Sequence, residues 1–162
     1  MIEIRHRTTD PEKPTASIQV NTLEQPLSDH ELGGLLSNLD LYPQALQAYE
    51  TATLRNPADP LAYIGKGNML LFLRRPVEAL AAYTEAVRLA PTLAMAYAGQ
   101  GMALRTLRRY REALDAYNRA LLWDDSFAPA YYGKGYVLLR LNHFWQALRV
   151  YRRALQLEHR AA

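Results

Sequence analysis

The sequence predicts an all-α fold, a superhelical solenoid built from antiparallel helix pairs. The first observation behind this prediction is a fixed period of 34 residues, because seven positions carry the same residue in four successive segments. The second is the helical spacing of apolar residues within each period. The seven sets are Gly33, Gly67, Gly101 and Gly135; Leu36, Leu70, Leu104 and Leu138; Leu39, Leu73, Leu107 and Leu141; Ala45, Ala79, Ala113 and Ala147; Leu46, Leu80, Leu114 and Leu148; Tyr49, Tyr83, Tyr117 and Tyr151; and Ala52, Ala86, Ala120 and Ala154. A fixed period of this length is typical of repeat arrays, which usually bind other chains.

Residues 60–93 show how one period forms two helices. Asp59 can cap a first helix that starts at Pro60, since proline is tolerated in a first helical turn. We expect this helix to end near Arg74 and Arg75. Pro76 then starts a second helix, and a proline at position 91 ends it.

The small residues of the unit predict close contact between the two helices. A glycine inside a helix costs about 1 kcal/mol relative to alanine, so Gly67 requires a compensating role. We expect Gly67 to face a partner helix at short range, with Ala79 and Ala86 allowing the same approach and Tyr83 filling the remaining space.

The unit resembles the tetratricopeptide repeat, whose first helix carries an aromatic residue, Leu-Gly and Tyr, and whose second carries Ala, an aromatic residue, Ala and Pro. The strongest matches are residues 62–67 (AYIGKG), 96–101 (AYAGQG) and 130–135 (AYYGKG). The resemblance implies a right-handed superhelical solenoid, and it divides residues 26–161 into repeats 26–59, 60–93, 94–127 and 128–161. Lys66, Gln100 and Lys134 replace the leucine before the key glycine, and Asp125 and His159 replace the closing proline.

Residues 1–25 form an N-terminal extension outside this pattern. We expect them to be flexible, because Thr8–Pro14 has the composition of turn or coil. Residues 2–5 and 17–20 alternate like short strands, which leaves open an arm lying along the array.

The resemblance also implies a binding surface, since in this family the first helix of each repeat lines a concave groove. The predicted groove residues are Leu61, Ile64, Asn68, Leu71, Phe72, Met95, Met102, Arg105, Tyr132, Tyr136, Leu139 and Arg140. We expect Tyr132 and Tyr136 to anchor a ligand, although such residues can instead pack against a neighbouring helix. Only Asn68 and Arg105 match the set that grips a chaperone tail in one subtype, so an amphipathic helix or an extended apolar segment is the expected ligand.

The sequence predicts no enzyme, no cofactor and no metal site. The chain has no cysteine, and its four histidines lie far apart without carboxylates at ligand spacing. Residues 65–67 (GKG) lie inside a predicted helix, where a phosphate loop does not form. No apolar run has the length of a membrane span. We therefore expect a cytoplasmic protein-interaction module or adaptor.

Two other functions remain open at this point. Residues 94–162 hold 11 of the 19 basic residues, and Arg74, Arg75, Arg108 and Arg109 recur at one turn. Such an arginine edge could bind nucleic acid or another acidic partner, although the net charge is modest. A chaperone for a secreted client is the second. We also expect weak self-association, or contact with a partner, through apolar residues of the C-terminal repeat around Tyr151, Leu155 and Leu157.

Overall fold

The computed structural model describes residues 26–161, and this part of the chain is formed by eight α-helices without strands. The expectations for residues 1–25 lie outside the described residues. The helices are α1 (Asp29–Asn38), α2 (Tyr42–Arg55), α3 (Pro60–Phe72), α4 (Pro76–Leu89), α5 (Ala94–Thr106), α6 (Tyr110–Trp123), α7 (Ala128–Arg140) and α8 (Phe144–Ala161). The predicted all-α solenoid of helix pairs is confirmed.

The helices begin at the signals that the sequence carries. Ser28 and Glu31 form a capping box at the start of α1, with both reciprocal hydrogen bonds present. The carboxylate of Asp59 accepts a hydrogen bond of 2.9 Å from the backbone N–H of Leu61. The predicted starts of α3 at Pro60 and of α4 at Pro76 are therefore confirmed.

The turn inside each pair has the same conformation in all four repeats. Asp40, Arg74, Arg108 and Asn142 follow the first helix of their pair, and each has a φ of 58 to 63°. In the second repeat, the N–H of Arg75 donates to the carbonyl of Leu70 at 2.8 Å, which satisfies a helix-terminal oxygen. Asparagine and aspartate tolerate the left-handed region, whereas Arg74 and Arg108 adopt it at a conformational cost.

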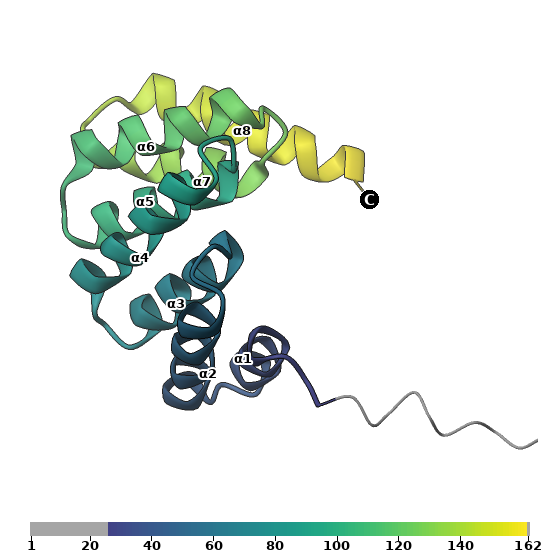
Figure 1. The fold of residues 1–162 in the computed structure, drawn as a ribbon. Helices are drawn as coiled ribbons and strands as arrows, with labels where there is room; N and C mark the ends of the chain where they lie inside the picture. Colours follow the sequence, from purple (N-terminus) through teal and green to yellow (C-terminus); the bar gives the residue numbers. More distant parts are fainter. Residues whose placement is uncertain (1–25, 162) are drawn as a thin grey trace, which may run out of the picture.

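The first helices of the pairs form a continuous layer. Helices α1, α3, α5 and α7 each contact the next one in this series, whereas α2, α4, α6 and α8 do not contact one another. The second helices therefore lie farther apart, and the stack curves around the first helices. Figure 1 shows the pairs following one another along an arc, with α1 near one end and α8 at the other.

Tyrosine rings packed between glycines hold neighbouring pairs together. The ring of Tyr83 lies between Gly67 of its own pair and Gly99 of the next pair, and a Cβ atom at either glycine would lie within 3.0 Å of the ring. Tyr49 and Tyr117 each have a corresponding pair of glycines. The predicted close approach at Gly67 is confirmed, and the second glycine explains how one ring joins two successive units.

Candidate functional site

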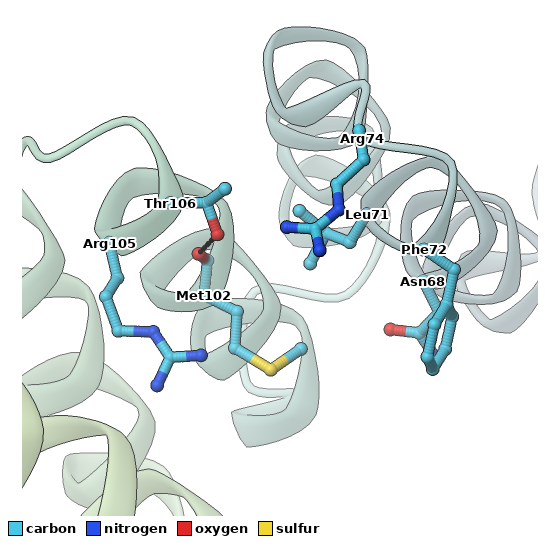
Figure 2. Close-up of a pocket in the computed structure, with 7 residues that line it drawn as sticks. All are labelled: Asn68, Leu71, Phe72, Arg74, Met102, Arg105 and Thr106. Atoms are coloured by element: carbon cyan, nitrogen blue, oxygen red, sulfur yellow. Dashed lines mark hydrogen bonds between the residues drawn. The ribbon is translucent and has the colours of Figure 1, made fainter.

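A pocket of about 330 Å³ lies between α3 and α5, on the layer formed by the first helices. Its lining residues are Asn68, Leu71, Phe72, Arg74, Met102, Arg105 and Thr106. Figure 2 shows the α3 residues and Arg74 on one side of this space, and Met102, Arg105 and Thr106 on the other. The pocket brings together five of the residues that the sequence placed in the groove.

The α3 wall of this pocket is held by contacts from the second helices. The side-chain oxygen of Asn68 accepts a hydrogen bond of 2.6 Å from the buried hydroxyl of Tyr83, which fixes the amide orientation. Phe72 stacks on Tyr42 with ring centroids 4.5 Å apart, yet 58% of Phe72 remains exposed. A large aromatic face is therefore positioned in advance and still available to a ligand.

A second pocket, of about 460 Å³, adjoins the first between α5 and α7. Its lining is Arg105, Thr106, Arg108, Tyr110, Tyr136 and Arg140, without any acidic residue. The guanidinium of Arg105 lies 5.0 Å from the ring centroid of Tyr136, and that of Arg140 lies 5.5 Å from the centroid of Tyr110. These cation–π contacts orient two of the three positive charges. An anionic group is the ligand that fits this lining.

Five predicted groove residues line neither of these two pockets. Leu61, Met95 and Leu139 are 40–45% exposed on the same layer of helices. Ile64 is 4% exposed and belongs to the core. The hydroxyl of Tyr132 donates a hydrogen bond of 2.8 Å to Glu158 of α8, so this side chain is tied to its neighbouring helix. A ligand contact by these five residues stays a prediction.

Three lining residues outside the first helices were not among the predicted groove residues. Arg74 and Arg108 follow α3 and α5 in the turns with positive φ, which the sequence assigned to a separate edge. Tyr110 is the first residue of α6 and reaches the pocket between α5 and α7 from the second helix of its pair. Because the predicted groove residues were all taken from first helices, they could not include Tyr110.

The predicted arginine edge is partly neutralised. Arg75 forms two hydrogen bonds with the carboxylate of Glu78, of 2.7 and 2.6 Å, and Arg109 pairs with Glu112 in the same way. These bonds lower the pKa of both glutamates, so the carboxylates remain charged. Half of the edge is therefore paired within its own helices, which weakens its attraction for a polyanion.

Residues 26–161 contain no group of three histidine, aspartate or glutamate side chains placed to hold a metal ion. None of their helices is both long and apolar enough to cross a membrane.

Comparison with known proteins identifies the repeat. A family model described as tetratricopeptide repeat matches residues 32–94 and 98–162. Comparison with curated protein sequences gave no significant match.

Three similar solved structures share the fold. A thermophilic TPR protein of Thermus thermophilus, TTC0263, is 26% identical with a TM-score of 0.76, over 81% of this chain and 73% of that one. MamA of Desulfovibrio magneticus RS-1 is 23% identical with a TM-score of 0.72, over 81% and 74%. The first TPR of Spaghetti (RPAP3), bound to the HSP90 peptide SRMEEVD, is 21% identical with a TM-score of 0.68, over 70% and 90%.

Proposed function

The chain belongs to the tetratricopeptide-repeat family, and on this basis we propose that it is a protein-interaction module that binds a segment of a partner protein on its first helices. The observation that carries the proposal is the junction of two unlike pockets. The apolar pocket between α3 and α5 and the basic pocket between α5 and α7 share Arg105 and Thr106. One segment can therefore occupy both.

The lining specifies the chemistry of that segment. Leu71, Phe72 and Met102 offer apolar surface, and methionine adapts its shape to different side chains. Burying this surface supplies the affinity, because the hydrophobic effect grows with the apolar area removed from water. Arg105 and Arg140 then orient carboxylate groups of the segment. We infer a ligand that carries apolar side chains next to acidic ones.

A related fold offers indirect support. Two TPR domains of RPAP3 were solved with the peptide SRMEEVD, which carries a methionine next to a run containing three acidic residues. At 21 and 22% identity these structures share the fold with this chain. They illustrate that such a stack of helices can take an extended acidic peptide.

Partner capture from the native host, followed by a titration with the captured segment, tests the proposal. Phe72→Ala with Met102→Ala removes the apolar lining, and Arg105→Gln with Arg140→Gln removes charge. We expect at least a tenfold loss of affinity from the first pair, because aromatic anchors in concave sites often contribute about 2 kcal/mol or more. We expect a smaller, salt-dependent loss from the second pair.

Leu122→Ala is the matched control, because Leu122 is 78% exposed on α6 and lines neither pocket. Circular dichroism confirms that every variant is folded. Binding that survives both groove pairs would contradict the proposal. Tight binding of a single-stranded oligonucleotide that disappears on Arg74→Gln with Arg108→Gln, at equal salt, would support the nucleic-acid function instead.

A further inference from the structure

One apolar stripe of the array remains uncovered on α8. Leu148, Tyr151 and Leu155 lie three and four residues apart and therefore share one face of this helix. Leu148 and Leu155 are 52% and 51% exposed, whereas Leu46, which corresponds to Leu148 in the first repeat, is 6% exposed. The difference arises because each earlier second helix is covered by the next pair, while α8 contacts α7 alone among the described helices.

Tyr151 lacks half of the packing that the other repeat tyrosines have. Tyr49, Tyr83 and Tyr117 each contact a glycine of their own pair and a glycine of the following pair. Tyr151 contacts Gly135 of its own pair and no other glycine of the described chain. The contacts between successive helix pairs at Tyr49, Tyr83 and Tyr117, the inner junctions, show what such a ring accepts on its open side. It accepts a helix that carries glycine at the point of contact, since a Cβ atom there would overlap the ring.

Charge adds a second requirement for the occupant. In two of the three inner junctions the residue after the contact glycine contacts the residue after the tyrosine. Lys66 lies 3.5 Å from Glu50 in this way, and Gln100 donates a hydrogen bond of 3.1 Å to Thr84. On α8 the residue after the tyrosine is Arg152, which is exposed. An acidic residue after the contact glycine is its natural partner.

The rest of α8 has the same sign of charge. The helix carries four arginines against one acidic residue, Glu158, which already accepts a hydrogen bond from Tyr132. An approaching acidic helix is attracted by this surface, whereas a basic one is repelled. The steric and the electrostatic requirements therefore agree on one class of occupant.

We propose that this face of α8 binds a helix of a partner protein that places glycine against Tyr151 and an acidic residue next to it, against Arg152. The bound helix extends the stack as a further first helix would. This surface is separate from the groove on α3, α5 and α7, and the proposal does not depend on the groove ligand.

A second copy of this chain does not meet these requirements. In an end-to-end stack, α1 of one copy would cover α8 of another, and the residue aligned with Gly65 and Gly99 is Glu31. The side chain of Glu31 would overlap the ring of Tyr151, just as a Cβ atom added at Gly65 would overlap the ring of Tyr49. Leu32 would then face Arg152. Two α8 helices set against each other would bring their arginines together.

A synthetic peptide with the sequence of residues 94–127 and the change Gln100→Glu is a suitable probe. It carries the contact glycine, Gly99, followed by an acidic residue. Fluorescence anisotropy of the labelled peptide is measured against the full chain. We expect saturable binding that weakens at least tenfold with Gly99→Leu in the peptide, and at least tenfold with Leu148→Glu in the protein.

Three controls identify the site. Leu122→Glu, an exposed change on α6, and Phe72→Ala, a change in the groove, are both expected to leave binding unchanged. Arg152→Glu should weaken binding of the acidic peptide and strengthen binding of a peptide with Gln100→Lys. Such an exchange of preference reports a direct charge contact rather than a general loss of structure.

Several results would overturn the proposal. They are no saturable binding at millimolar peptide, equal binding of the Gly99→Leu peptide, or binding unaffected by Leu148→Glu. Light scattering of the full chain alone provides a further check. Concentration-dependent association that is lost with Leu148→Glu would make a second copy the occupant, as the sequence-based expectation of self-association allows.

Discussion

The substitutions Gly99→Ala and Gly34→Ala are expected to change the stability of the protein in opposite directions. Both glycines lie inside first helices, so alanine gains about 1 kcal/mol of helix propensity at either site. At Gly34 the nearest atom to an added Cβ is the hydroxyl oxygen of Tyr49, at 3.7 Å, which is an ordinary contact. Gly34→Ala should therefore stabilise the array by about 1 kcal/mol.

The same change at Gly99 forces an overlap. The added Cβ would lie within 3.0 Å of three atoms of the Tyr83 ring, and Tyr83 is fully buried and cannot move aside. Overpacking of a core costs about 1–3 kcal/mol, and so deep an overlap belongs at the upper end of that range. After the gain in propensity, Gly99→Ala should destabilise the protein by about 2 kcal/mol.

Urea denaturation followed by circular dichroism measures both free energies of unfolding. A double-mutant cycle with Tyr83→Leu then tests the cause, because removing the ring should make Gly99→Ala nearly neutral or stabilising. Two results would refute this reasoning. The first is that Gly99→Ala stabilises the protein as Gly34→Ala does. The second is that Gly99→Ala still lowers the free energy of unfolding after the Tyr83 ring has been removed.

Three further predictions concern the turns, the buried tyrosines and the paired arginines. Arg108→Gly should raise the free energy of unfolding by about 1 kcal/mol in urea denaturation, because glycine tolerates positive φ, whereas Asn142→Gly should gain only a few tenths. Burial raises the pKa of Tyr117 to about 12 from 10.0, so the unfolded chain loses this proton first. The contribution of Tyr117 should stay level below about pH 9.5 and fall by roughly 2–3 kcal/mol between about pH 10 and 12. The difference between the parent chain and Tyr117→Phe in urea denaturation isolates it from the fall due to Tyr83, whose pKa burial also raises. Glu112→Gln releases Arg109, so binding of heparin, measured by calorimetry, should strengthen and become more salt-dependent, while Asp115→Asn, a charge change without an ion pair among the described residues, serves as the control.

The fold could be predicted from the sequence because the same packing residues recur in every repeat. Proline at positions 60 and 76 marked two helix starts, and the recurrence of Gly67 and Tyr83 identified the contact between the helices of a pair. The second glycine of each junction was visible at the same period. Its role could not be inferred, because the sequence does not say which ring of a neighbouring unit it faces.

The candidate site was predicted less completely. Asn68, Phe72 and Arg105 reach pockets, because positions on one face of a first helix share a surface whatever the rest of the unit does. Tyr132 and Ile64 depend on contacts from other helices, and one is bonded to α8 while the other is buried. Helical periodicity defines a face, and the neighbouring helices decide which of its side chains remain accessible.

The two proposed surfaces lie on different helices, which has a consequence for how the protein works. The groove is formed mainly by α3, α5 and α7, and the open stripe by α8, so a groove ligand and a docked helix need not compete for the same side chains. Helix α7 connects the two surfaces, because Tyr132 donates a hydrogen bond to Glu158 of α8 and its ring lies 6.2 Å from the ring of Tyr151, measured between centroids. Both surfaces are also rich in arginine, which is why both proposals name an acidic partner. The two proposals together imply that the chain holds two acidic segments at once, and the order in which they bind is then set by their concentrations and affinities rather than by exclusion.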